Sequence, residues 1–486
     1  MSQHNSYEPV IGLEIHVQLN LESKAFAREK IEFGNDPNHW VSPISLGLPG
    51  TLPVANKQHI ESALKLGIAL HCDIANQFFF DRKHYFYADL PKGYQISQHN
   101  IPYCTNGFIP VITEDGILKV PLVQIHMEED AGKSIHDIHP DYSLLDYNRA
   151  GAPLLEIVTE PVLHDPKHVS ATISTIQQIV QYLGISDGDM EKGQLRCDCN
   201  VSLRPMGSNA LGTKCEIKNV NSKRFARKAI EAEIKRQVSI LQSGGNIVQS
   251  TLNFDPTSET TTPTREKETA HDYRYMPEPD MPAFEVTEER LNKLRTELGL
   301  LPEEAYQEFI LLGLQHQEAY SFIQSRREAT FLHHFLTWNK DSKGLMNLYV
   351  NQLRPYLKKN GLGFSHIIER KKGFTEFQNA MKSASVSRSQ MIKDILPMIL
   401  KQSATFSPSQ VIEDLSQTSS AKVDGDLIES KVTEIINQFP DKKVAFQKGK
   451  KGLLGFFMGQ AMRQLNQKVN PQDLQQIILK HLNDQS

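Results

Sequence analysis

The sequence is poor in cysteine and has no long apolar run. Its five cysteines among 486 residues are odd in number and sparse, which excludes a secreted scaffold held by disulfide bonds and agrees with a reducing compartment. No segment approaches the length of a membrane span, and residues 1–5 lack the charged start and apolar core of a signal peptide. We therefore expect a cytoplasmic protein that does not contact membranes.

An excess of charge of one sign is also missing. The chain carries 53 basic and 57 acidic residues, a formal net charge of -4, so no overall basic field favours nucleic acid. Any binding of nucleic acid must therefore come from a local patch. The length of 486 residues is enough for roughly two to four domains, each with its own core.

The sequence does have strand-like segments with one apolar and one polar face. In residues 10–19 the apolar side chains alternate with Glu14 and His16, which therefore point to the same side. Such strands are typical of an antiparallel sheet that packs on helices with one face and leaves the other open. Segments 195–204 and 214–218 alternate in the same way, and segment 153–158 is an apolar run that contains one carboxylate.

The open face of these strands would collect a set of metal-ligating side chains. Carboxylate oxygens with one imidazole fit Mg²⁺ or Mn²⁺ better than structural zinc, which prefers sulfur and nitrogen. The alternative is that Glu14 and Asp198 are ordinary solvent-facing strand residues and that residues 128–130 form an exposed acidic turn. The predicted metal ligands are Glu14, His16, Glu128, Glu129, Glu156 and Asp198.

Two helices are predicted to frame the sheet. The first runs from a cap at Asp165 to Gly184, and the second from Ser222 to Gly244. The second helix carries a basic side that either faces RNA or is simply solvated. Residues 249–271 are polar and rich in threonine, which predicts a long loop.

These patterns predict an α+β chain of three domains. The first, 1–286, is a cradle built on the antiparallel sheet with flanking helices. Helical stripes without strand-like alternation predict an all-α helical domain over 287–404. A serine-rich break then leads into a small α-helical tail domain, 405–486.

A cluster of lysines precedes a predicted helix in the tail domain. Lysines in this position suit an RNA phosphate backbone, which is recognised by charge and position rather than by base sequence. The alternative is an ordinary solvated surface. The lysines predicted to contact a phosphate backbone are Lys448, Lys450 and Lys451.

Ordered motifs along most of the chain resemble the B subunit of the tRNA-dependent amidotransferases. In the first domain they include the strand 10–17, which holds Glu14 and His16, and the acidic stretch 126–133. The remaining motifs are 46–54, 80–87, 89–95, 148–151, 196–198 and 272–275, with 452–460 and 470–471 in the tail.

The resemblance implies a kinase and transamidase that acts on Glu-tRNA(Gln), Asp-tRNA(Asn) or both. ATP phosphorylates the side-chain carboxylate of the mischarged amino acid, and ammonia then displaces the phosphate. By motif, Glu14, His16, Glu129 and Glu156 are the catalytic candidates, and the six predicted ligands hold Mg²⁺. Lysines that either contact nucleotide phosphates or are merely solvated are Lys83, Lys92 and Lys133.

One departure from the family pattern concerns zinc. Many relatives carry cysteine pairs, spaced like a zinc site, where this chain has Ala27, Glu29, Ser42 and Ser45. No zinc is expected here, because these four residues offer no thiolate. We expect packing and hydrogen bonds to hold the loop 24–46 instead.

The resemblance also implies partner subunits, because the sequence contains no motif for glutamine hydrolysis. It contains no Gly-x-Ser-x-Gly elbow and no N-terminal cysteine that could release ammonia. An amidase (glutaminase) subunit would supply ammonia through a tunnel, and a small third subunit would complete the enzyme. Two other classes of function remain open: a tRNA-binding scaffold without catalysis, and a free-standing carboxylate-amine ligase of the glutamine-synthetase type.

Overall fold

The computed structural model of the chain describes residues 6–266, 273–383, 386–420, 425–465 and 471–483. The chain forms two compact units, 1–330 and 331–486. Within the described residues, no helix is both long and apolar enough to cross a membrane. The finer division into domains 1–286, 287–404 and 405–486 stays a prediction.

A ten-stranded sheet forms the centre of the first unit. Its strand order is β15-β14-β13-β12-β1-β11-β8-β6-β2, and β7 pairs with β8 at the side of this path. All pairs are antiparallel except β13 with β14. The strands are β1 (Tyr7–Gln18), β2 (Asp73–Ile74), β6 (Cys104–Thr105), β7 (Phe108–Thr113), β8 (Gly116–Glu129), β11 (Pro153–Thr159), β12 (Leu195–Pro205), β13 (Cys215–Val220), β14 (Ser250–Asp255) and β15 (Thr260–Glu266).

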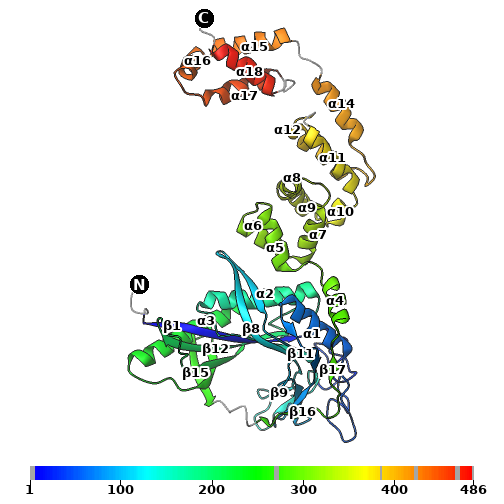
Figure 1. Cartoon of the computed structure of the whole chain (residues 1–486), viewed down its shortest axis with the longest axis vertical. Coiled ribbons are helices and arrows are strands. Elements are labelled where there is room, and N and C mark those ends of the chain that lie inside the picture. Colours follow the sequence, from blue (N-terminus) through cyan, green and yellow to red (C-terminus); the bar gives the residue numbers. More distant parts are fainter. Residues whose placement is uncertain (1–5, 267–272, 384–385, 421–424, 466–470, 484–486) are drawn as a thin grey trace. The chain divides into compact units, whose positions relative to one another are not determined.

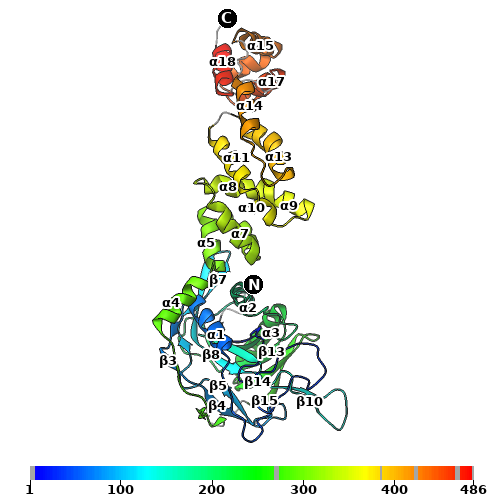
Figure 2. The ribbon, with the colours of Figure 1, turned by 90° about the vertical axis from the view of Figure 1, so that its right-hand side faces the viewer.

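Three helices cover the apolar face of the sheet. Figures 1 and 2 show α1 (Lys57–Ala69), α2 (Pro166–Leu183) and α3 (Lys223–Gln242) along one side of it. The predicted caps are confirmed, because Asp165 accepts a hydrogen bond from a backbone N–H in the first turn of α2, and Ser222 does so for α3. The apolar residues of β1 lie in the core between sheet and helices, so the polar face stays open.

Smaller elements complete the first unit. Three short sheets consist of β4 (Asp81–His84) with β5 (Tyr94–Ser97) and β16 (Met276–Pro277), of β9 (Lys133–Ile135) with β10 (Leu144–Asp146), and of β3 (Gln77–Phe78) with β17 (Phe284–Glu285). The helices that follow are α4 (Glu288–Glu297), α5 (Pro302–Leu311), α6 (His316–Ile323) and the start of α7 (Arg326–Leu336).

The predicted long loop over 249–271 is wrong for the described part of that range. Residues 250–255 and 260–266 form β14 and β15, an antiparallel hairpin at the edge of the large sheet. Threonine is β-branched and favours extended backbone, which outweighs the turn signals of proline and serine here. Residues 267–271 lie outside the described residues.

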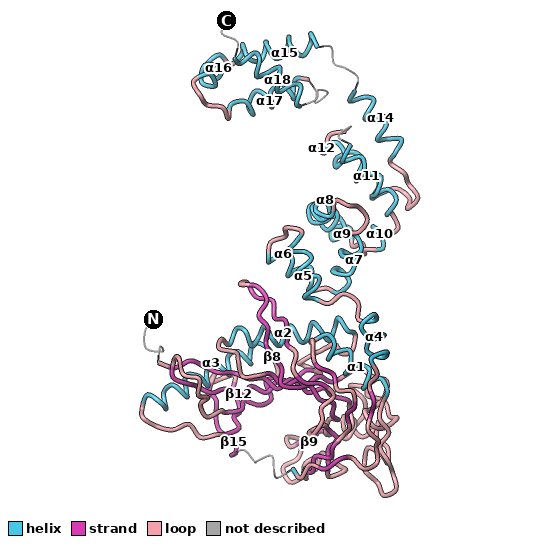
Figure 3. Tube along the Cα trace, in the orientation of Figure 1, coloured by secondary structure: helices cyan, strands magenta, loops and turns pink. Residues whose placement is uncertain are grey.

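The described part of the second unit is helical, as predicted, and Figure 3 shows it as helices joined by loops. The apolar faces of its last four helices pack into a core of their own. The helices are α8 (Ser342–Leu348), α9 (Arg354–Asn360), α10 (Ser365–Ile368), α11 (Lys371–Ser383), α12 (Arg388–Gln390), α13 (Leu396–Lys401), α14 (Ser409–Ser420), α15 (Gly425–Gln438), α16 (Pro440–Gln447), α17 (Leu453–Gln464) and α18 (Pro471–Asn483), with π-helical turns at Tyr349–Leu353 and Met391–Ile395.

Candidate active site

The polar face of the sheet brings together side chains that are far apart in the sequence. His16 on β1 lies opposite Glu156 on β11, and Glu156 lies opposite His126 on β8. Directly opposed residues in an antiparallel pair have neighbouring side chains on one face of the sheet. The register therefore builds a row of alternating imidazoles and carboxylates across three strands.

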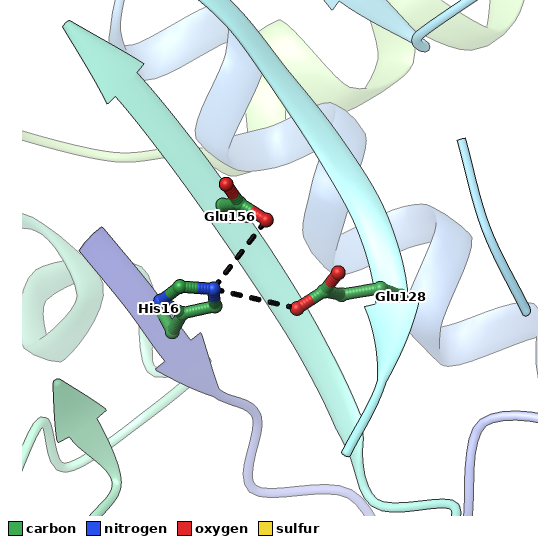
Figure 4. Close-up of side chains that lie close together, drawn as sticks. All are labelled: His16, Glu128 and Glu156. Carbon is green, nitrogen blue, oxygen red and sulfur yellow. Dashed lines mark ion pairs between the residues drawn. The ribbon is translucent and has the colours of Figure 1, made fainter. Parts of the chain in front are cut away.

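Three of the predicted ligands converge into a compact group. The Nε2 atom of His16 lies 3.4 Å from Oε2 of Glu156 and 3.6 Å from Oε1 of Glu128, and Figure 4 shows the three side chains pointing toward one another. One ligand atom from each lies within 4.8 Å of the others. We call His16, Glu128 and Glu156 the triad.

Carboxylates hold His16 of the triad and the neighbouring His126 in their charged form. Burial by itself lowers the pKa of His16, but the carboxylates of Glu156 and Glu128 outweigh it and raise the pKa to about 9. The same balance raises the pKa of His126 to about 10. Burial would raise the pKa of Glu156, yet His126 and His16 hold it well below its usual range.

The donor set of the triad fits a divalent cation once His16 gives up its proton, because only a neutral imidazole ligates a metal. It offers two carboxylates and one imidazole, a combination of hard oxygen donors and one nitrogen that suits Mg²⁺ or Mn²⁺. His126 lies just outside this set, with Nε2 2.9 Å from Oε2 of Glu156. It can therefore orient the Glu156 carboxylate as a hydrogen-bonded neighbour of a ligand.

Glu14 and Asp198 occupy the next row of the same face. They lie opposite each other across β1 and β12. The side-chain amide of Asn200 donates to Oε1 of Glu14 at 2.8 Å, and Nζ of Lys218 lies 3.8 Å from Oδ2 of Asp198. Both carboxylates therefore share the open face with the triad, but neither belongs to the group that converges on one point.

The structure does not bring Glu129 into the triad. Glu128 and Glu129 are consecutive on β8, so their side chains leave opposite faces of the strand. The Glu129 carboxylate forms an ion pair with Lys92 and accepts a hydrogen bond from the backbone N–H of Ile96 at 2.9 Å. Lys92 is therefore already engaged by a carboxylate, and both side chains of this ion pair are nearly buried.

Sequence comparison identifies the family. The profile described as GatB/GatE catalytic domain matches residues 9–292, and the profile described as GatB domain matches residues 331–482. The B subunit of the aspartyl/glutamyl-tRNA(Asn/Gln) amidotransferase from Persephonella marina is 40% identical over 97% of this chain and 98% of its own length. Proteins of the same name from Pelodictyon phaeoclathratiforme and Chlorobaculum tepidum are each 41% identical, over 98% and 97% of this chain and 99% and 98% of their own lengths.

The chain belongs to the family of amidotransferase B subunits. The predicted resemblance is thus confirmed over nearly the full length of the chain, and the family is one of ligase-type enzyme complexes. The first profile covers the sheet that carries the triad except for the first two residues of β1. The second begins where the second compact unit begins, at residue 331.

Aromatic residues of two family motifs face the acidic group. Burial, together with the carboxylates of the 128–130 stretch, raises the pKa of Tyr85, and burial with Glu128 and Glu156 raises that of Tyr275. Both phenols therefore stay uncharged. Lys83 lies over the ring of Tyr273, with Nζ 4.7 Å from the ring centroid. Lys83 therefore lies among these aromatic rings, whereas Lys133 on β9 is exposed.

Two site residues were missed by the sequence interpretation. His126 completes the row of imidazoles and carboxylates, and Asp130 binds Arg196 at 2.8 Å and lies 3.4 Å from Arg149. The signal for His126 was its position two residues before Glu128, which places both on one face of a strand. The partners of Asp130 come from other strands and loops, so no local pattern could indicate them.

A polar cluster occupies the positions where relatives were expected to carry cysteines. Nζ of the fully buried Lys24 donates to the backbone oxygen of Trp40 at 2.7 Å and lies 3.9 Å from Oε1 of Glu29. Ser45 donates to the same Glu29 carboxylate, and the Ser42 hydroxyl accepts from the backbone N–H of Ser45 at 3.3 Å. Polar contacts therefore hold this loop, as predicted.

The tail lysines precede a helix, as predicted. Lys448 ends α16, and the turn with Lys450 and Lys451 leads into α17. All three side chains are exposed, although Nζ of Lys451 also lies 4.5 Å from the ring centroid of Phe446. The turn thus presents three cations on the surface of the second unit.

Proposed function

We propose that the chain catalyses ATP-dependent transamidation of Glu-tRNA(Gln), Asp-tRNA(Asn) or both. The observation that carries the proposal is the triad of His16, Glu128 and Glu156 on the polar face of the sheet. The chain that holds it matches amidotransferase B subunits along nearly their whole length. Those relatives are named for the same pair of tRNAs. A reaction on aminoacyl-tRNA agrees with the expected cytoplasmic location.

The reaction needs activation because a carboxylate is a poor electrophile. An oxygen of the side-chain carboxylate attacks the γ-phosphorus of ATP, the bond to the bridging oxygen breaks, and ADP leaves. The nitrogen of ammonia then attacks the acyl carbon of the acyl phosphate. The carbon–oxygen bond to phosphate breaks and an amide forms, giving Gln-tRNA(Gln) or Asn-tRNA(Asn).

The residues of the open face have different roles in this reaction. His16, Glu128 and Glu156 would hold Mg²⁺, with Glu14 and Asp198 as further oxygen ligands from the next row of the face. When bound, Mg²⁺ neutralises the charge of the transferring phosphoryl group. His126 orients the Glu156 carboxylate through the contact between its Nε2 atom and Oε2 of Glu156.

Glu129 and the three motif lysines surround this centre. Glu129 remains a candidate for positioning through its pair with Lys92, at the end of the strand that carries Glu128. Lys83, which lies over the ring of Tyr273, and the exposed Lys133 remain candidates for nucleotide phosphates.

Other parts of the enzyme supply ammonia and hold the tRNA. A partner amidase subunit releases ammonia from glutamine, and a small third subunit completes a heterotrimer. The tail domain contacts the tRNA backbone through Lys448, Lys450 and Lys451, whose exposed position before α17 supports this role.

Glu156→Gln tests the proposal in the reconstituted complex with mischarged tRNA, ATP, Mg²⁺ and ammonium chloride. The amide keeps the shape but removes the charge that faces two imidazoles. We expect ATP-dependent amidation to fall by about 100-fold or more, while the partner still hydrolyses glutamine. The matched control is Glu160→Gln, which changes an exposed carboxylate just beyond the same strand.

Two results would contradict the proposal. Full amidation by Glu156→Gln would leave the triad without a catalytic part and would favour a scaffold. Equal ATP-dependent amidation of free glutamate or aspartate without tRNA would favour a free-standing ligase.

A further inference from the structure

A cation lies at the end of the row that contains His16 and Glu156. Arg196 on β12 is directly opposite His16, on the side of β1 away from Glu156. The Cβ atoms of directly opposed residues are about 4.5–5.5 Å apart, so the side chain of Arg196 is a neighbour of the triad. This side chain is 31% exposed and can therefore be reached by a reactant.

Asp130 holds the guanidinium group of Arg196 in place. Nη2 of Arg196 donates to Oδ2 of Asp130 at 2.8 Å, and the same carboxylate oxygen lies 3.4 Å from Nε of Arg149. Arg149 also donates to the backbone oxygens of Ala131 at 3.1 Å and Gly132 at 2.6 Å, so its own position is fixed. One carboxylate therefore faces two guanidinium groups, and these three side chains together carry a net positive charge.

Arg196 has hydrogen-bonding capacity that this anchor does not use. A guanidinium group presents several N–H donors in a planar fork and has no acceptor. Within the described ranges of the chain, the side chain of Arg196 forms no hydrogen bond other than that with Asp130. The fork matches two oxygens of a carboxylate or a phosphoryl group. The remaining donors therefore favour an anionic ligand.

The neighbouring cation of the open face, Lys218, differs in this respect. Its Nζ atom lies 3.8 Å from Oδ2 of Asp198 and 3.6 Å from Oε1 of Glu216, so two carboxylates share its charge. Among the described residues, one carboxylate pairs with Arg196, and that carboxylate pairs with Arg149 as well. Arg196 is therefore better placed than Lys218 to receive a further anion.

We propose that Arg196 is a catalytic residue that binds an oxyanion of the reactants. The inference rests on the proposed function, in which a carboxylate attacks a phosphoryl group, so that two anions must meet on a face rich in acidic residues. The oxyanion belongs either to the γ-phosphoryl group of ATP or to the side-chain carboxylate of the aminoacyl-tRNA. A fixed cation beside the triad offsets the repulsion between them. Asp130 is the positioning residue for this contact.

Arg196→Gln tests the inference in the full complex. The change removes the cation and the fork but keeps a polar side chain. We expect kcat for amidation with ATP and ammonium chloride to fall by about 100-fold or more. The matched control is Arg204→Gln, which removes an equal charge from the same face of β12, where Nε of Arg204 donates to Glu8 at 2.8 Å. This control should keep kcat within about twofold.

Equilibrium binding identifies the anion that Arg196 holds. The affinity of the complex is measured for ATP against ADP, and for Glu-tRNA against Gln-tRNA, because each pair differs in one of the two anions. We expect Arg196→Gln to lower the preference for ATP over ADP by about tenfold, which assigns the contact to the γ-phosphoryl group. A lower preference for Glu-tRNA over Gln-tRNA would assign it to the carboxylate instead. Arg204→Gln should leave both preferences unchanged.

The inference fails separately from the proposed function. A wild-type complex without ATP-dependent amidation would overturn the function. If the wild type is active and Arg196→Gln, shown to be folded by thermal melting, keeps both binding preferences, the role of Arg196 alone is overturned, whatever its kcat. If Arg196→Gln does not fold, Arg196→Lys keeps a cation beside Asp130 but loses the fork. Wild-type preferences in that variant would overturn the inference.

Discussion

At the scale of single residues, the site depends on ion pairs between histidines and carboxylates on neighbouring strands. Glu156 has two imidazoles within 3.4 Å of its Oε2 atom, His16 and His126. A carboxylate that is buried among strands would be costly without such partners. The same contacts of the two histidines therefore stabilise the fold and orient the Glu156 carboxylate of the proposed reaction centre.

His126→Leu separates these two effects. We expect the free energy of unfolding at pH 7 to fall by roughly 3–5 kcal/mol, because the change leaves buried carboxylates with one cation fewer. Mg²⁺ should recover part of the loss, since a bound cation supplies the missing positive charge. Urea unfolding with and without Mg²⁺ measures both.

The control for this change is His139→Leu, which alters an exposed histidine. It should shift stability by less than about 0.5 kcal/mol. Equal stability of His126→Leu and the wild type would show that His126 is not needed to balance Glu156.

At the scale of elements, the central strands could be predicted from the sequence, whereas the strands that pair with them could not. The alternation of apolar residues with Glu14 and His16 fixed the faces of β1, and the same pattern held for β12. The register that places Glu156 between two histidines depends on pairing between separate segments, which are 140 residues apart for His16 and 30 residues apart for His126. A single sequence carries no local signal for such pairing.

The missed hairpin has a different cause. β14 and β15 lie at the edge of the sheet, and most of their side chains are polar on both faces. Only Leu252 and Phe254 of β14 alternate as apolar residues, which is a short period-two signal, so the composition of the segment resembled a loop. The prediction of Glu129 as a metal ligand beside Glu128 has a third cause of error. The acidic residues 128–130 suggested one cluster, whereas adjacent side chains of a strand point to opposite faces.

The loop that contains Lys24 and Ser45 gives a test at the same scale. Burial lowers the pKa of Lys24 from 10.5 to about 8, although Glu29 and Glu129 oppose the shift. Between pH 8 and 10.5 the unfolded chain binds this proton and the folded protein does not, so Lys24 raises the free energy of unfolding as the pH rises through that window. The rise should be missing in Lys24→Met.

Lys24→Met should also destabilise the protein by roughly 3 kcal/mol at pH 7, because Glu29 loses its buried cation. Lys30→Met, a change at an exposed lysine of the same loop, serves as the control. A Lys24→Met protein with wild-type stability and the same pH dependence would contradict the role of the buried ammonium.

At the scale of the whole molecule, the proposed function assigns the chemistry to the first unit and the binding of RNA to the second. If the tail binds tRNA phosphates, changing Lys448, Lys450 and Lys451 together to alanine should weaken tRNA binding and lower the slope of its salt dependence, by about one unit for each phosphate that is no longer neutralised. Turnover with ammonia at saturating tRNA should stay nearly intact. Filter binding over a range of salt concentrations measures the slope.

A matched control changes three exposed lysines elsewhere in the second unit: Lys343, Lys358 and Lys359. This variant loses the same formal charge, so it corrects for any general effect of net charge on RNA binding. If both triple variants lost affinity equally, or neither did, the turn before α17 would have no special part in binding.

The polar cluster around Lys24 has a consequence for how the enzyme matures. The loop closes through an ammonium group, a carboxylate and two hydroxyls, and residues 24–51 contain no cysteine. None of these groups is on the path by which thiolates are oxidised. We therefore expect this loop to reach its final shape without a metal-loading step, and a chelator to leave it unchanged.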